Sequence, residues 1–152
     1  MIIDDLLNEF ARTIGLDAIE PDDEPCILEF DGNPVSLSYR NNRERLLLYS
    51  DAGFLVRPAP ELLLGLLEAN ALHQAVGDGA IGLIVDEHRG GFVVVYSQLL
   101  VTATLDLATL TDAMRNFVEL LEAWQQNLAE LENSASGGED NGPGRGDDLI
   151  PV

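Results

Sequence analysis

Few residues of this chain have the types and spacing needed for catalysis or for binding a cofactor. One candidate is a glycine-rich segment. Residues Gly77-Asp78-Gly79-Ala80-Ile81-Gly82 match the GxGxxG pattern of dinucleotide-binding loops. Such a loop must follow a strand and open a helix, so that the helix N-terminus meets the pyrophosphate. Here a helical pattern precedes the segment and a strand pattern follows it. We therefore interpret the segment as a connection from a helix to a strand.

Metal ligands and nucleophiles are equally sparse. The run Asp86-Glu87-His88 carries metal-binding donors, but it lies on a predicted hairpin turn, and His73 is the other histidine of the chain. The single cysteine, Cys26, starts a strand and has little to serve as a base, so a buried small hydrophobic residue is the favoured interpretation. We expect no catalytic residues, no metal and no cofactor, and thus a protein that is not an enzyme.

The charge balance argues against two classes of partner. The 152 residues include 8 basic and 27 acidic side chains, for a net charge of −19. Nucleic acids require a basic surface, and anionic membranes attract basic segments, so we expect neither partner. The acidic N-terminus, the single cysteine and the lack of any apolar run of about 18 residues favour a cytoplasmic location.

Hydrophobic periodicity predicts the elements of the first half. Apolar residues from Ile3 to Ile14 recur at spacings of three and four, which predicts an amphipathic helix that Gly15 closes. Strands are expected at 26–31, 35–40 and 45–50, joined by turns at Asp31-Gly32-Asn33 and Asn41-Asn42. Short connections predict antiparallel neighbours, with the third strand more central and 26–31 a candidate edge strand.

The second half begins with a helix expected from about Pro60 to Val76, which is apolar on nearly all sides. A small domain cannot bury such a helix alone, so a partner subunit is expected to cover it. A second hairpin pairs 80–85 with 92–100. The later of these strands is apolar on both faces, which suits a central position.

The last ordered element is a long helix expected from about Leu107 to Leu131, with an apolar seam along one side. From Glu132 onward Gly, Ser, Pro and acidic residues predict a disordered tail. The predicted fold class is α+β: three helices and a twisted, antiparallel five-stranded sheet in the order helix, three strands, helix, two strands, helix. One domain spans 1–131, the tail spans 132–152, and the chain is expected to form a homodimer.

Three stretches of apolar residues and glycines occur together in one known family. They are LLNEFARTIGL with CILEFDG; RLLLYSDAGF; and ELLLGLLEANALHQAVGDGAIGLIVDEHRGGFVVVYSQL followed by LDLATLTDAMRNFVELLEAWQQNL. Together they cover about Met1 to Leu131. In these stretches, in size, acidity and element order, the chain resembles the class I type III secretion chaperones, the CesT-like (Tir chaperone) family.

The resemblance implies a small acidic homodimer in the bacterial cytoplasm. Such a dimer binds the N-terminal region of one secreted effector and keeps it soluble, non-globular and competent for secretion, without ATP. Effector contacts would then fall on the first helix and first strands, at Ile3, Leu7, Phe10, Leu28, Phe30, Val35 and Leu37. The dimer interface would fall on the leucine-rich helix and the strand after it, at Leu62, Leu63, Leu66, Leu67, Leu83 and Val85.

Two alternatives stay open. One is a regulator of the same fold that sequesters another regulatory protein instead of a secreted one. The other is a small-ligand-binding domain or enzyme that uses the Gly77 loop. Strand addition is consistent with binding of an effector segment, since an extended peptide can join the edge strand at 26–31.

Overall fold

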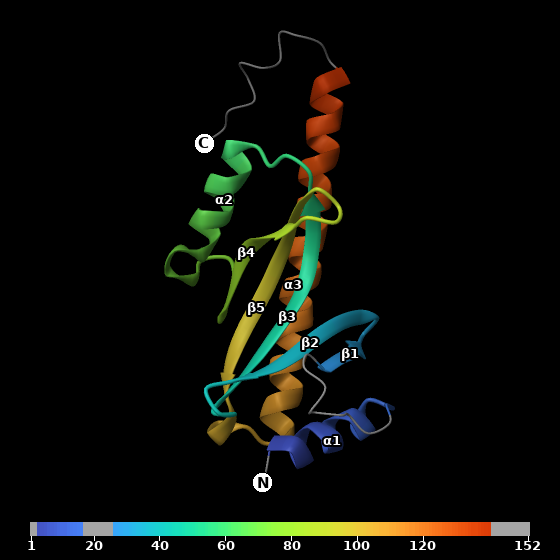
Figure 1. The fold of residues 1–152 in the computed structure, drawn as a ribbon, viewed down its shortest axis with the longest axis vertical. Coiled ribbons are helices and arrows are strands. Elements are labelled where there is room, and N and C mark those ends of the chain that lie inside the picture. Colours follow the sequence, from blue (N-terminus) through green and yellow to red (C-terminus); the bar gives the residue numbers. More distant parts are fainter. Residues whose placement is uncertain (1–2, 17–25, 141–152) are drawn as a thin grey trace. The chain divides into compact units, whose positions relative to one another are not determined.

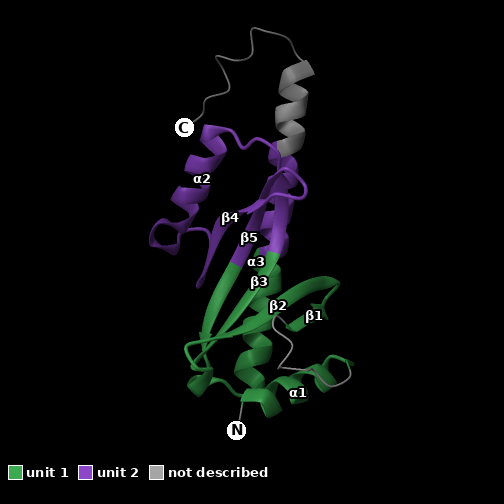
Figure 2. Ribbon diagram, viewed as in Figure 1, with its two compact units in different colours: residues 1–50, 97–120 green, residues 51–96, 121–152 purple. Residues whose placement is uncertain are grey.

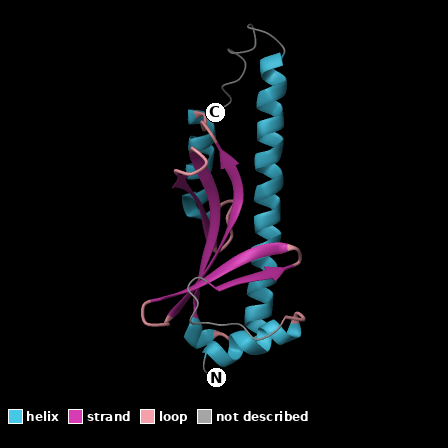
Figure 3. Cartoon of the chain, turned by 45° about the vertical axis from the view of Figure 1, so that its right-hand side comes forward, coloured by secondary structure: helices cyan, strands magenta, loops and turns pink. Residues whose placement is uncertain are grey.

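The computed structural model describes the backbone of residues 3–16 and 26–140, and the side chains of 3–16 and 26–131. Helices and strands follow one another in the predicted order (Figure 1, Figure 3). Two short 3-10 turns, η1 and η2, come after α2 and β5. The elements are α1 (Ile3–Thr13), β1 (Cys26–Phe30), β2 (Asn33–Arg40), β3 (Arg45–Leu55), α2 (Pro60–Asn70), η1 (Ala71–His73), β4 (Gly79–Asp86), β5 (Gly91–Val101), η2 (Thr102–Thr104) and α3 (Leu107–Asp140).

The five strands form one sheet in the order β1-β2-β3-β5-β4. The β1–β2 hairpin turns on two residues, Asp31 and Gly32, which both have positive φ (49° and 80°). Such a two-residue turn matches the twist of antiparallel strands, which is why the Asp-Gly pair predicts it correctly. The predicted antiparallel pairing of β1 with β2 and of β2 with β3 is confirmed.

The position of β5 is also confirmed. This strand lies between β3 and β4, as its two apolar faces predict, and β4 is therefore an edge strand. At the opposite end of the sheet, β1 is the other edge strand, as predicted.

The prediction for α2 was wrong at its C-terminal end, because the helix ends at Asn70 and not at Val76. The Asn70 side chain pairs with the main chain of β4: its Nδ2 donates to the carbonyl of Ile81 (2.6 Å) and its Oδ1 accepts from the Ile81 N–H (2.9 Å). The chain then turns away through Leu72 and His73, which have φ of 55° and 54°. A tertiary contact thus overrides the local helical pattern.

The prediction for α3 was wrong at its end as well. The helix continues past Leu131 to Asp140, so the expected tail begins in helix. Once a helix is nucleated, each further residue needs no new nucleus, and weak helix formers can therefore extend it. Residues 141–152 of the expected tail lie outside the described residues, so their disorder stays a prediction.

Two compact units divide the chain, and β3, β5 and α3 each contribute residues to both (Figure 2). The first unit comprises 1–50 and 97–120, and the second comprises 51–96 and 121–152. Each has its own buried apolar residues. Those of the first unit include Leu6, Leu7, Phe10, Leu28, Val35, Leu37, Leu46, Leu48, Leu110, Met114 and Phe117; those of the second include Leu55, Leu66, Val76, Ile81, Val94, Tyr96, Leu121 and Leu128.

The apolar seam of α3 supplies core residues to both units. Leu110, Met114 and Phe117 are buried in the first unit, and Leu121 and Leu128 in the second. In the second unit the backbone of β3 comes close to the helix: a Cβ built on Gly53 would lie 3.2 Å from Leu128 Cδ1. This spacing leaves little room for a side chain at position 53.

Candidate protein-binding surfaces

The polar residues singled out by their types have structural partners. Among the described residues, no three His, Cys, Asp or Glu side chains group in a way that could hold a metal ion. Asp86 accepts two hydrogen bonds from Arg89, one from the backbone N–H to Oδ1 (3.1 Å) and one from Nε to Oδ2 (2.7 Å). These hydrogen bonds lower the pKa of Asp86. Arg89 in turn stacks on the Phe54 ring at 4.3 Å. Asp86 therefore stabilises the turn of the β4–β5 hairpin.

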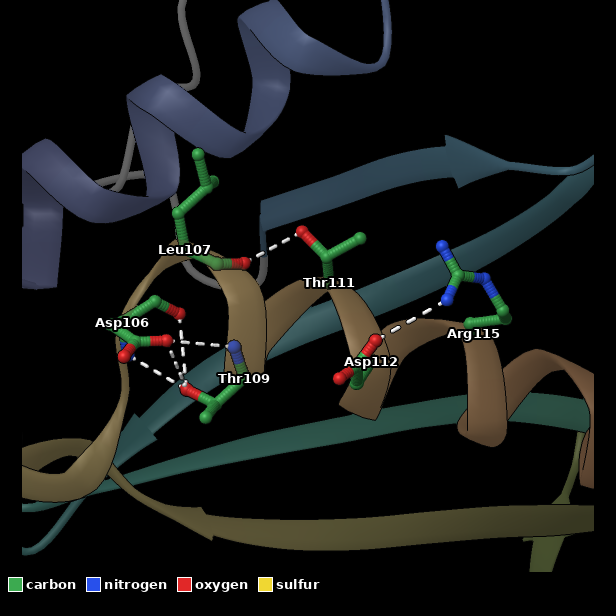
Figure 4. A network of polar contacts seen from close by, with 6 residues as sticks. All are labelled: Asp106, Leu107, Thr109, Thr111, Asp112 and Arg115. Atoms are coloured by element: carbon green, nitrogen blue, oxygen red, sulfur yellow. Dashed lines mark hydrogen bonds and ion pairs between the residues drawn. The ribbon is translucent and has the colours of Figure 1, made fainter.

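A second polar network begins α3 (Figure 4). Asp106 Oδ1 accepts from the Thr109 N–H (2.8 Å), while the Asp106 N–H donates to Thr109 Oγ1 (2.8 Å). This reciprocal pair satisfies main-chain donors at the helix start. The hydrogen bonds from Thr109 lower the pKa of Asp106. One turn further along, Arg115 pairs with Asp112 at 3.3 Å. The network is a helix cap and gives no sign of catalysis.

The glycine-rich segment has the arrangement expected from its neighbours. It follows α2 and η1, and the chain enters β4 at Gly79. A helix N-terminus that could receive a pyrophosphate does not follow it. The segment instead connects a helix to a strand.

A three-residue cluster ties α1 to β2 and the turn after it. Asp4 of α1 accepts hydrogen bonds from the Tyr39 hydroxyl and from Arg43 Nη1, the latter at 2.6 Å. Arg43 also stacks on the Tyr39 ring at 4.9 Å. The Tyr39 hydrogen bond is the main cause that lowers the pKa of Asp4, and Arg43 adds to it. Burial is the main cause that raises the pKa of Tyr39.

This cluster predicts an acid-dependent loss of stability. The pKa of Asp4 in the folded chain lies below its ordinary value of 3.8, so the carboxylate stabilises the fold above that pH and stops doing so as the pH falls through the lower folded value. The pair is partly exposed, so we expect about 0.5–1 kcal/mol. Urea unfolding at pH 6 and pH 3 measures the effect. Between these two pH values, the free energy of unfolding should fall less in Asp4→Asn than in the wild type. An equal loss in both would contradict a stabilising role for Asp4, and Asp5→Asn is the charge-matched control on the same turn.

An apolar surface lies on α2, the turn after it and β4, within the second unit. Helix α2 packs beside β4, and the Asn70–Ile81 hydrogen bonds join them. We call this surface the α2–β4 patch. It comprises the exposed side chains Leu64, Leu67 and Leu72, together with Ile84 and Val85 of β4, which as consecutive strand residues point to opposite faces of the sheet.

The predicted dimer-interface residues divide between this patch and the core. Leu67 is 68% exposed and Val85 is also exposed, as an interface requires. Leu62, Leu63 and Leu83 are half-buried. Leu66 is buried in its own chain, where it faces inward on α2 with Ala69, and its place in a dimer interface stays a prediction. Sequence reasoning missed three exposed residues, namely Leu64, Leu72 and Ile84.

Leu72 is the most exposed of these residues, at 90%. Its left-handed φ is rare for a residue with a bulky side chain. No sequence signal could have found this conformation, because it depends on the end of α2 at Asn70. Leu64 and Ile84, in contrast, lie within apolar runs that already suggested a covered surface.

The predicted effector-contact residues in the first unit are mostly core. Leu7, Phe10, Leu28, Val35 and Leu37 are buried, so a bound chain cannot touch them without opening the fold. Helix α1 packs inside the chain, where the Phe10 ring stacks on Phe30 with centroids 5.9 Å apart, and effector contact at the five buried residues stays a prediction. Ile3 and Phe30 are half-buried and stay available as contacts.

The opposite face of the same sheet carries the exposed apolar residues of the first unit. In β3 the buried residues Leu46 and Leu48 alternate with the half-buried Leu47 and Tyr49. Ile27 pairs with Ser36, and Ser36 pairs with Tyr49, so these three side chains share that face. On β5, Leu99 and Val101 alternate with the core positions. We call this face the outer sheet patch: Ile27, Leu47, Tyr49, Leu99 and Val101.

The outer sheet patch reaches the edge strand β1. Ile27 is 63% exposed, and β1 pairs with β2 on one side. No other strand in the described part of the chain pairs with its far side. An edge strand of this kind offers main-chain donors and acceptors to an added strand. The alternation of residues 26–31, which puts Ile27 on the face opposite Leu28, was the sequence signal for this face.

The comparison with family models and the comparison with solved structures are consistent with each other. The model of the Tir chaperone protein (CesT) family matches residues 5–125. A chain of the ExsC–ExsE complex is similar at 30% identity and a TM-score of 0.66, covering 82% of this chain and 91% of that chain. A chain of the HopA1–SchA chaperone–effector complex is similar at 27% identity and a TM-score of 0.58, covering 80% and 91%. A search of curated proteins gave no significant match.

Proposed function

Since this chain belongs to the Tir chaperone protein (CesT) family, we propose that it is a type III secretion chaperone. As a homodimer in the bacterial cytoplasm, it binds the N-terminal segment of a secreted effector and keeps that segment soluble and non-globular. The similarity to a chain of a chaperone–effector complex supports the effector as partner. The activity is binding and needs no cofactor.

The outer sheet patch beside the edge strand β1 is the observation that carries this proposal. An extended segment can pair with β1 through its main chain while its apolar side chains contact Ile27 and the neighbouring strands. Ordering a flexible segment costs several kcal/mol, so the contact must be large. A sheet face that spans β1, β2, β3 and β5 supplies such an area.

The α2–β4 patch supports the homodimer. Leu64, Leu67 and Leu72 are exposed apolar side chains of α2 and the turn after it, and exposed apolar surface of this kind marks protein–protein contact sites. A two-fold axis would place the same patch of each copy in contact with its partner. No helix among the described residues is long and apolar enough to cross a lipid bilayer.

Capture from the native bacterium tests the function. The tagged protein should retain one protein that the type III apparatus secretes, and limited proteolysis of the complex should protect its N-terminal segment. That segment should lack a globular core when bound, as judged by NMR amide dispersion. Ile27→Asp should weaken the complex about tenfold or more, because a charge replaces an apolar contact.

The matched control is Val56→Asp, which adds the same charge at an exposed apolar residue outside the outer sheet patch. It should retain the effector. A captured partner that is never secreted would contradict the chaperone function and favour the regulator of the same fold. Equal retention by both variants would contradict the outer sheet patch as the binding surface.

A further inference from the structure

Two arginines face each other at one end of the outer sheet patch. Arg40 ends β2 and Arg45 begins β3, and the two residues are direct partners in the antiparallel register. Side chains at directly opposed positions point to the same face of the sheet. Arg40 is exposed and Arg45 is half-buried. Two positive charges therefore lie side by side on this face.

Neither arginine has a carboxylate partner in the described part of the chain, although acidic residues outnumber basic ones 27 to 8. Arg40 donates to Ser38 Oγ and to the Tyr39 carbonyl, the latter at 3.0 Å, and Arg45 donates to the Glu44 carbonyl at 3.4 Å. Arg43, Arg89 and Arg115, in contrast, each pair with an aspartate.

Like charges directly opposed across two strands repel one another. An anion placed between the two guanidinium groups would remove that repulsion. Guanidinium is also the side-chain group whose planar, forked donors match a carboxylate best. The pair is thus suited to receive a carboxylate from another molecule.

The surroundings specify what carries that carboxylate. Next to Arg45 along β3, on the same face, come Leu47 and then Tyr49, and Leu99 and Val101 lie on the neighbouring strand β5. In an extended chain, alternate side chains share one face and repeat about every 6.8 Å. A strand-like segment would therefore match this face if it carried one acidic residue and apolar residues two and four positions away from it.

We propose that Arg40 and Arg45 bind the carboxylate of an acidic residue in the effector segment and so set its register on the outer sheet patch. This inference rests on the proposed function and names the chemistry of the partner. The net charge of −19 repels strongly acidic segments at long range, so the pair selects one carboxylate within a neutral or basic segment.

A random decapeptide library displayed on phage, selected on the purified protein, tests the inference. Selected peptides should carry Asp or Glu with apolar residues two and four positions away. For the best peptide, the version with Asn or Gln in place of the acid should bind about tenfold more weakly to the wild type. On Arg40→Gln/Arg45→Gln this difference should fall below about twofold, because the carboxylate has lost its partners.

The control Arg57→Gln/Arg115→Gln removes the same net charge from exposed arginines elsewhere and should keep the wild-type difference. Thermal unfolding of both double variants establishes that they are folded. Two results would overturn the role of the arginine pair and leave the chaperone function intact. One is that the selected peptides are apolar but lack the acidic residue. The other is that the ratio of affinities between the acidic peptide and its amide version is unchanged in Arg40→Gln/Arg45→Gln. A library that yields no binder would overturn the inference that this face recognises a short extended segment, whereas the capture experiment decides the proposed function separately.

Discussion

Replacement of Leu67 by aspartate is expected to convert the proposed dimer to folded monomers. Leu67 is 68% exposed on α2 in the single chain, so the substitution leaves the interior unchanged. In the dimer the same side chain would lie in a water-excluded contact, where an unpaired charge is costly. We expect association to weaken more than about 100-fold, which sedimentation velocity or light scattering would measure.

Two neighbouring changes make this result specific. Leu66→Asp places the charge one residue earlier, at a position buried within its own chain, and should unfold the protein rather than merely separate the subunits. Leu131→Asp adds the same charge at an exposed leucine of α3, outside the α2–β4 patch, and should remain dimeric. A Leu67→Asp variant that stays dimeric would contradict the α2–β4 patch as the interface.

Truncation of Phe10 to alanine should destabilise the fold strongly. Phe10 is completely buried on α1 and stacks on Phe30, so its removal leaves a cavity between the helix and β1. Loss of a buried aromatic ring costs about 3–5 kcal/mol, or a fall in Tm of about 10 °C or more. Urea and thermal unfolding followed by circular dichroism would measure it.

Ile27→Ala separates folding from binding. Ile27 lies on β1 close to Phe30 in sequence, but its side chain is on the outer face and is mostly exposed. Its truncation should leave the free energy of unfolding within about 0.5 kcal/mol of the wild type and weaken effector binding. The opposite pattern, in which Phe10→Ala leaves stability unchanged and Ile27→Ala lowers it, would reverse our assignment of the two faces.

The charge and the apolar patches have complementary consequences. A chain with exposed leucines on α2 and exposed apolar residues on the outer sheet face is prone to nonspecific association. A net charge of −19 opposes such association, because copies of the chain repel one another at long range. The same repulsion opposes the proposed dimer, so an apolar contact through the α2–β4 patch would have to outweigh it.

Local patterns were sufficient for the order and type of the elements. Period two in β2, spacings of three and four in α1 and α3, and the Asp31-Gly32 turn each depend on residues close together in the chain. The central place of β5 could also be predicted, because an apolar residue on both faces of a strand requires cover on both sides. The resemblance in the apolar stretches also predicted the family, and the match over residues 5–125 confirms it.

Which apolar residues are buried and which are exposed depended on long-range packing instead. Phe10, Leu28 and Val35 are as apolar as Ile27 and Leu99, and composition cannot say which group faces a neighbouring element of the same chain. Likewise Leu66 and Leu67 are adjacent and identical, yet one is core and the other surface, because α2 presents one side to β4. Burial depends on how the helices and the sheet pack together. The type of a residue indicates only that it favours burial, and not which element or partner buries it.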